Sequence, residues 1–160
     1  YPVRKVTDLK PLLQEAQGLT PREQDVDVRY AVDPDLWRVE VDEGQIRQVL
    51  RHIIQNAVEA MPGGGAMDIL AGNAIVEESD RLPIREGRYV KISIRDHGQG
   101  IPEEHLSKIF DPYFTTKEAR RGLGLAVSYA IIRNHEGLIR VESRKGQFAA
   151  FQILLPAAKE

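Results

Sequence analysis

Residues 42–61 decide the fold, and they read DEGQIRQVLRHIIQNAVEAM. Apolar residues recur in this stretch at intervals of three and four, which is the spacing of one face of an α-helix. They are Ile46, Val49, Leu50, Ile53, Ile54, Ala57 and Met61. Asp42 opens the segment, and the run Pro62-Gly63-Gly64-Gly65 closes it, because proline and glycine do not continue a helix. The sequence therefore predicts a long amphipathic helix with one apolar face.

Segments of alternating apolar and polar residues lie on both sides of this helix and predict strands. Before the helix, residues 26–30 and 37–41 alternate around a turn at residues 33–35, and we expect them to pair as a hairpin. The other expected elements are strands at 67–70, 90–96, 139–141 and 151–155, helices at 8–17 and 123–135, and an exposed charged loop at 77–88. This mixed order predicts an α/β (α+β) two-layer sandwich, a mostly antiparallel sheet with helices on one face.

Composition narrows the class of protein. The chain has 160 residues, which fits a single domain spanning 1–160. Its formal net charge of -2 gives no broad attraction to nucleic acid or to an anionic membrane. It has no cysteine, which excludes disulfides, thiolate metal sites and a cysteine nucleophile. The chain begins at Tyr1 without methionine, so we interpret it as a piece of a longer protein.

A polar stripe on the long helix is the first candidate for chemistry. His52, Asn56 and Glu59 are four and three residues apart and share a face of the helix. Asn56 lies among apolar neighbours, and an amide buried without a partner is costly. A neutral amide oxygen suits Mg²⁺, which takes few protein ligands and keeps waters and phosphate oxygens. Taken alone, Asn56 is better explained as a helix-border residue bonded to the backbone.

The second candidate is the segment 96–102, DHGQGIP, at the end of a predicted buried strand. A carboxylate at Asp96 can accept a hydrogen bond from an exocyclic amine such as adenine N6. Guanine offers an acceptor at the same position, so this contact favours adenine. Gly98 and Gly100 have no Cβ, and the backbone there can turn tightly and approach a base or a phosphate. Without further evidence, the segment is better explained as an Asx-turn that closes a strand.

The third candidate is the run Gly122-Leu123-Gly124-Leu125 at the start of a predicted helix. Free backbone N–H groups and the helix dipole make such a position suited to phosphate. Between the second and third candidates lies the segment 110–117, FDPYFTTK, whose aromatic residues suit a loop that covers a ligand. Lys117 adds positive charge near the expected phosphates. Each of these three signals is weak alone.

Their order and spacing together resemble the catalytic domain of sensor histidine kinases, in the superfamily that includes gyrase, the Hsp90 chaperone and MutL. HIIQNAVEAM is similar to the N box of that family, DHGQGIP to the G1 box, IFDPYFTTK to the F box and GLGLA to the G2 box. The final segments GLIRVES and FQILLP are similar to its two closing strands. The resemblance covers nearly the whole chain.

The resemblance implies a Bergerat-type fold that binds ATP and Mg²⁺. It implies that Asn56 ligates Mg²⁺ and that Asp96 holds adenine N6. It also implies that Gly98 and Gly100 form the floor beneath the base. The remaining implied ligand contacts come from Ile101, Lys117, Gly122, Leu123, Gly124 and Leu125. Residues 114–121 would form a lid over the nucleotide.

Three positions depart from the family pattern. His52 stands where many relatives carry a second Asn, and it either contacts the reacting groups or lies at the pocket rim. Arg120-Arg121 occupies a part of the lid where small residues are common. Ala149-Ala150 replaces a usual Thr pair, which should weaken base binding by about 1 kcal/mol, the typical contribution of one hydrogen bond.

The resemblance also implies partners. The γ-phosphoryl of ATP would pass to a histidine on a separate dimerisation domain and then to an aspartate of a response regulator. The four histidines of this chain lie outside any acceptor motif, so the piece needs that second domain. We expect a bacterial cytoplasmic location without direct membrane contact, whether or not the parent protein is anchored in a membrane. The alternatives are another ATPase or serine kinase of the superfamily, and a non-catalytic module that binds nucleotide or a partner.

Overall fold

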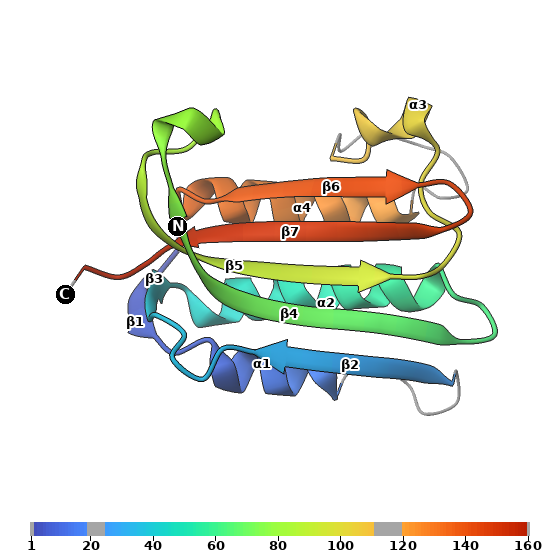
Figure 1. Cartoon of the computed structure of the whole chain (residues 1–160), viewed down its shortest axis with the longest axis horizontal. Helices are drawn as coiled ribbons and strands as arrows, with labels where there is room; N and C mark the ends of the chain where they lie inside the picture. Colours follow the sequence, from blue (N-terminus) through green and yellow to red (C-terminus); the bar gives the residue numbers. More distant parts are fainter. Residues whose placement is uncertain (1, 19–24, 111–119, 160) are drawn as a thin grey trace.

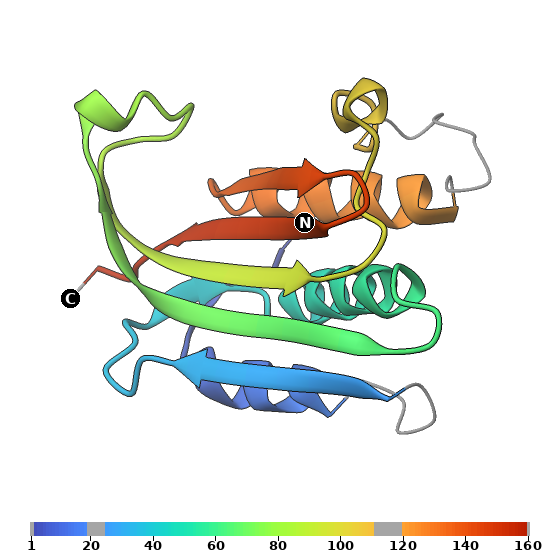
Figure 2. The same cartoon turned by 45° about the vertical axis from the view of Figure 1, so that its right-hand side comes forward.

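The computed structural model describes residues 2–18, 25–110 and 120–159, and for residues 120–124 only the backbone. Within these ranges one sheet is covered on a single face by α1, α2 and α4 (Figure 1 and Figure 2). The strands are β1 (Lys5–Thr7), β2 (Val26–Val32), β3 (Val39–Val41), β4 (Gly65–Val76), β5 (Gly87–Asp96), β6 (Leu138–Arg144) and β7 (Phe148–Pro156). The helices are α1 (Lys10–Gln17), α2 (Glu43–Glu59), η2 (Glu78–Asp80), α3 (Glu103–Leu106) and α4 (Arg120–Asn134).

The main sheet confirms the predicted fold class. It has five strands in the order β2-β4-β5-β7-β6. The pair β2–β4 is parallel, and the pairs β4–β5, β5–β7 and β6–β7 are antiparallel. No helix in the described part of the chain combines the length and apolar character that a bilayer crossing needs.

The predicted hairpin of residues 26–30 with 37–41 is wrong. β2 pairs in parallel with β4, from Val26 opposite Gly65 to Val32 opposite Ala71. β3 belongs to a separate two-stranded sheet in which Val6 of β1 lies opposite Glu40. The two segments that look like hairpin partners in the sequence therefore pair with different strands.

The side chain of Asn73, on β4, explains this departure. Its Oδ1 accepts a hydrogen bond from Trp37 N at 2.8 Å, and its Nδ2 donates to Asp35 O at 3.0 Å. Asp33 N also donates to Ala71 O at 3.0 Å. These contacts hold the turn after β2 against β4 and direct the chain away from β2. They join residues more than thirty positions apart, which local alternation cannot reveal.

Helix α2 contributes much of the hydrophobic core. It confirms the long amphipathic helix that the sequence predicted for residues 42–61. Its apolar face is almost fully buried between the sheet and the other helices, with Ile46, Val49, Leu50, Ile53 and Ile54 each at most 1% exposed. The predicted helices at 8–17 and 123–135 are present as α1 and α4, although α4 already begins at Arg120. The predicted loop at 77–88 contains the short helix η2, and α3 and β1 were not predicted.

His135 connects the beginning of α2 with the end of α4. Its Nε2 accepts a hydrogen bond from Asp42 N at 3.0 Å, and its Nδ1 lies 2.8 Å from Ile131 O. Because a backbone N–H donates to Nε2, Nδ1 is the ring nitrogen that can donate to Ile131 O. Since Asp42 precedes α2 and His135 follows α4, the two helices run in opposite directions. The end of α2 and the beginning of α4 therefore lie at the same edge of the domain (Figure 1).

Asp42 caps α2, and its titration should make the stability of the domain depend on pH. Hydrogen bonds from the backbone N–H groups of Val3, at 2.9 Å, and Gln45, at 3.2 Å, hold the pKa of the Asp42 carboxyl below its usual value. A lowered pKa in the folded state gives stability that is complete above the unfolded pKa, about 4, and is lost as the pH falls through the folded pKa.

We therefore expect the free energy of unfolding to decrease more steeply between about pH 5 and about pH 3 in the unmutated domain than in Asp42→Asn. Urea titrations of both proteins across this range measure the difference. Parallel pH profiles for the two proteins would show that the cap carboxylate does not contribute as its contacts indicate.

Candidate functional site

Asp96 ends the central strand β5 and lies inside the protein. Its side chain is 2% exposed, between Met67 of β4 and Ala149 of β7 in the strand register. One carboxylate oxygen accepts a hydrogen bond from Gly98 N at 3.1 Å. This contact fixes the carboxylate at the start of the loop that follows β5. A buried and oriented acceptor at this position can receive a hydrogen bond from the exocyclic amine of a base.

The loop after Asp96 packs against the end of α2. Gln99 N donates to Ala60 O at 3.2 Å. A Cβ added to Gly98 would lie 2.2 Å from the same carbonyl oxygen. Ala60 N in turn donates to Asn56 O at 3.0 Å, so one helical turn separates Asn56 from the residue that contacts this loop. The structure thus brings the Asp96 loop and the Asn56 end of α2 to one edge of the domain.

Close packing within the protein also explains why residue 100 is a glycine. Gly100 adopts φ 68°, in the left-handed region, and a Cβ there would lie 2.3 Å from Arg144 O. The sequence predicted that Gly98 and Gly100 allow approach to a base or phosphate. In the structure both glycines already allow close approach to neighbouring backbone carbonyls, so the fold requires them independently of a ligand.

Replacing Gly98 with alanine should therefore destabilise the domain. The new methyl group would overlap a backbone carbonyl that cannot rotate away, at a cost of about 3 kcal/mol. Gly72, on β4, is the matched control, because no atom lies within 4 Å of a Cβ placed there. Urea unfolding should show a large loss for Gly98→Ala and little change for Gly72→Ala. Equal stabilities of the two variants would contradict the packing of this loop on α2.

Asn56 and His52 form the polar stripe of α2 that the sequence predicted. Both residues are half-buried, whereas Glu59, the third member, is exposed. Asn56 Nδ2 and His52 Nδ1 are buried, and neither has a hydrogen-bond partner among the described residues. A buried amide without a protein partner fits a residue that contacts a ligand, because leaving such a group unpaired costs about 1–3 kcal/mol. The unpartnered N–H donor of Asn56 fits a phosphate oxygen, and the carbonyl oxygen of the same amide is the atom that could ligate a phosphate-bound metal.

The remaining predicted contacts are placed in part. Ile101 is 8% exposed, and its N–H donates to Ser143 Oγ at 2.6 Å. Leu125 is 1% exposed, so any contact with a phosphate would come from its backbone. Gly122 and Leu123 are among the first four residues of α4, whose N–H groups have no partner within the helix. Gly124 follows within the same helix, and Lys117 lies outside the described residues.

Two residues that support the site were not predicted. Ser143 of β6 binds Ile101 N and donates to Phe148 O at 2.8 Å, which ties the loop to the last hairpin. Asp68 of β4 accepts from His97 Nε2 at 3.0 Å and pairs with Arg29 Nε at 3.2 Å. Both lie in ordinary alternating strands, so no pattern in the sequence marks them.

Sequence comparison gives the family. Residues 41–159 match the family described as "Histidine kinase-, DNA gyrase B-, and HSP90-like ATPase". The chain is 36% identical over 157 residues to sporulation kinase A of Bacillus subtilis, covering 96% of this chain and 24% of that protein. It is 38% identical over 159 residues to the sensor kinase CckA of Brucella abortus, covering 95% of this chain and 17% of that protein. The chain therefore spans a quarter or less of these two relatives.

Solved structures agree with this relationship. The nucleotide-free catalytic domain of histidine kinase ThkA superposes with a TM-score of 0.80 at 32% identity, covering 96% of this chain and 95% of that one. Full-length ShkA in complex with AMPPNP gives 0.79 at 26% identity, covering 99% and 32%. ThkA in complex with the response regulator TrrA gives 0.74 at 30% identity, covering 97% and 42%. The chain belongs to the family of histidine kinase-, DNA gyrase B- and HSP90-like ATPases, and the relatives that it matches include sporulation and sensor kinases, among them the sensor histidine kinase ZraS of Escherichia coli.

Proposed function

We propose that this domain binds ATP and transfers its γ-phosphoryl group to a histidine on a separate dimerisation domain, for relay to an aspartate of a response regulator. The observation that carries the proposal is the position of Asp96. Its buried carboxylate begins a loop that is bonded to Ala60, one helical turn from the unpaired amide of Asn56. One group suits the base of a nucleotide, and the other offers an N–H donor to its phosphates and an amide oxygen to the metal that they carry.

We propose that Asp96 accepts a hydrogen bond from adenine N6 and that the loop through Gly100 lies beneath the base. The hydrogen bond from Gly98 N holds one carboxylate oxygen, which orients the group before a ligand arrives. The closing contact from Ile101 N to Ser143 Oγ keeps the far side of the loop against β6. These contacts preorganise the acceptor, so little ordering is required when the base binds.

Mg²⁺ would be held by the amide oxygen of Asn56, together with phosphate oxygens and waters. The ion would neutralise charge on the transferred phosphoryl group. The first N–H groups of α4, those of Gly122 and Leu123 among them, would bind phosphate oxygens at the same edge. We also propose that His52 and Lys117 contact the phosphates. His52 lies one helical turn before Asn56 on α2.

The protein's part in the reaction is to position ATP against an acceptor that supplies the nucleophile. The chain would be one catalytic domain, and the acceptor histidine would lie on another part of the parent protein. The complexes of ShkA with AMPPNP and of ThkA with TrrA support a nucleotide and a response regulator as partners. A cytoplasmic location would give the domain access to ATP.

The test mixes the domain with an acceptor-histidine dimerisation domain and ATP labelled on the γ-phosphate, with Mg²⁺. Label that appears on the acceptor histidine supports the proposal. Tight ATP binding without transfer to any acceptor would favour a non-catalytic nucleotide-binding module. Steady release of free phosphate without an acceptor would favour an ATPase of the same superfamily.

A further inference from the structure

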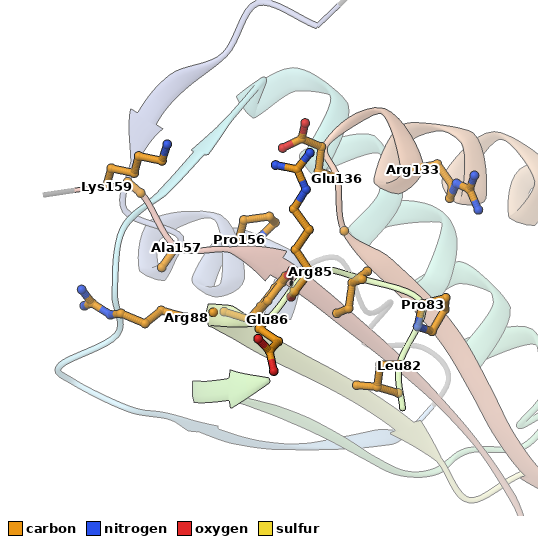
Figure 3. Close-up of a pocket in the computed structure, with 15 residues that line it drawn as sticks. Leu82, Pro83, Arg85, Glu86, Arg88, Arg133, Glu136, Pro156, Ala157 and Lys159 are labelled. Carbon is orange, nitrogen blue, oxygen red and sulfur yellow. Dashed lines mark hydrogen bonds between the residues drawn. The ribbon is translucent and has the colours of Figure 1, made fainter. Parts of the chain in front are cut away.

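A pocket lies at the end of the sheet opposite to Asp96. Its volume is about 1160 Å³, more than most small-molecule sites require. Gly87 and Tyr89 line it at the beginning of β5, the strand that Asp96 ends. The other walls are the segment 82–86, the turn after α4 and the tail that follows β7 (Figure 3). A ligand here would not compete for the Asp96 loop.

The wall formed by residues 82–86 is held in place by contacts within the protein. Tyr89 and Leu154 alternate with core residues of β5 and β7, so they lie on the face of the sheet that the helices do not cover. Leu82 and Ile84 pack against them there. Tyr89 Oη also donates to Arg85 O at 2.6 Å. The pocket is therefore built on a small apolar cluster of its own.

The charges around the pocket are unbalanced. Its lining includes the cations Arg85, Arg88, Arg133 and Lys159 and the carboxylates Glu86 and Glu136. Glu86 already accepts a hydrogen bond from Glu78 N at 2.7 Å, and Glu136 faces Arg85 (Figure 3). Within the described ranges, neither Arg133 nor Lys159 forms an ion pair, although Arg133 donates to Tyr129 Oη at 3.3 Å and Arg88 lies over the Trp37 ring. The lining therefore has more cations than carboxylates, and its net charge is positive.

The positions of these cations decide between kinds of anion. Figure 3 shows Lys159 and Arg133 on opposite sides of the pocket, with Arg85 between them. A phosphate group is bound by donors that converge on one point. Separated cations, with Pro156 between Lys159 and Arg85 and Pro83 beside Arg133, suit carboxylates that are spaced along a chain with apolar residues (Figure 3). We propose that this pocket binds an extended acidic peptide segment of a partner protein.

The carboxylate of Glu136 should lower the affinity of this pocket for an acidic ligand. Glu136 adopts φ 61° at the end of α4, a position that usually favours glycine or asparagine, and its carboxylate faces Arg85. An acidic ligand would be repelled by that carboxylate. Glu136→Gln removes the repelling charge and keeps the size of the side chain. It should therefore bind the ligand about twofold more tightly, the scale of one exposed charge contact.

The test uses a fluorescein-labelled peptide of alternating glutamate and leucine, with fluorescence anisotropy as the readout. We expect Arg85→Ser combined with Lys159→Ser to weaken binding about tenfold, because two exposed charge contacts are lost. Arg51→Ser combined with Lys108→Ser is the matched control. It removes two exposed cations from elsewhere on the surface and should leave peptide affinity unchanged. All variants should bind ATP as the unmutated domain does, which separates this test from the kinase assay.

Equal peptide affinities for the pocket variant and the control variant would overturn the proposal. So would equal binding of a peptide in which glutamine replaces glutamate, because charge would then play no part. Displacement of the peptide by pyrophosphate at low concentration would instead assign the pocket to a compact phosphate anion. Higher salt should weaken peptide binding in the unmutated domain, since exposed charges are screened.

Discussion

Asn56→Ala is expected to lower phosphoryl transfer from ATP to an acceptor-histidine domain on the order of 100-fold, the usual effect of losing one group that stabilises transition-state charge. The amide lies on the half-buried stripe of α2, and its Nδ2 has no partner among the described residues. Alanine removes the proposed metal ligand and leaves the helix backbone unchanged. The rate of appearance of labelled phosphohistidine measures the effect.

Two further variants make this result specific. Gln55→Ala changes the neighbouring residue on the exposed side of α2, and it should transfer phosphate at the unmutated rate. Asn56→Asp keeps an oxygen ligand for Mg²⁺ and should recover part of the activity. Normal transfer by a folded Asn56→Ala protein would remove Asn56 from the site.

Asp96→Asn should weaken ATP binding about 10- to 100-fold, because a hydrogen bond to a charged group contributes about 1.5–3 kcal/mol. The asparagine oxygen can still accept from Gly98 N, so the loop should keep its conformation. Its amide group, however, is a donor and would oppose the exocyclic amine of adenine. Isothermal titration calorimetry with ATP and Mg²⁺ gives the two dissociation constants.

Glu59→Gln is the control for the loss of one negative charge near the end of α2. Glu59 is exposed, and its replacement should leave ATP affinity unchanged. The Asp96→Asn protein should also unfold at nearly the same urea concentration as the unmutated domain. An Asp96→Asn protein that binds ATP as tightly as the unmutated protein would mean that this carboxylate does not contact the base.

Patterns that arise from neighbouring residues could be predicted from the sequence. The helical spacing of Ile46 to Ala57 gave α2, and the alternation of Val90 to Ile94 gave the central strand β5. The pairing of strands depends on distant residues, and there the prediction failed. The side chain of Asn73 directs β3 away from β2, and nothing near β2 or β3 in the sequence indicates this.

In the candidate site, too, local motifs could be predicted from the sequence and contacts between distant residues could not. Asp96 and Asn56 were chosen from short motifs, and the structure places both at one edge, connected through Ala60. Gly98 and Gly100 were also chosen, but their close contacts with Ala60 O and Arg144 O could not be foreseen, because those carbonyls come from distant elements. Ser143 was missed because a serine in an alternating strand has no distinctive pattern.

The central claim is that the carboxylate of Asp96 reads the base of the nucleotide. The most direct measurement is calorimetric titration of the unmutated domain with ATP and with GTP, each in the presence of Mg²⁺. We expect ATP to bind at least about 10-fold more tightly, because guanine places an acceptor opposite the carboxylate and leaves a charged hydrogen bond unmade. Equal dissociation constants for the two nucleotides would contradict the account.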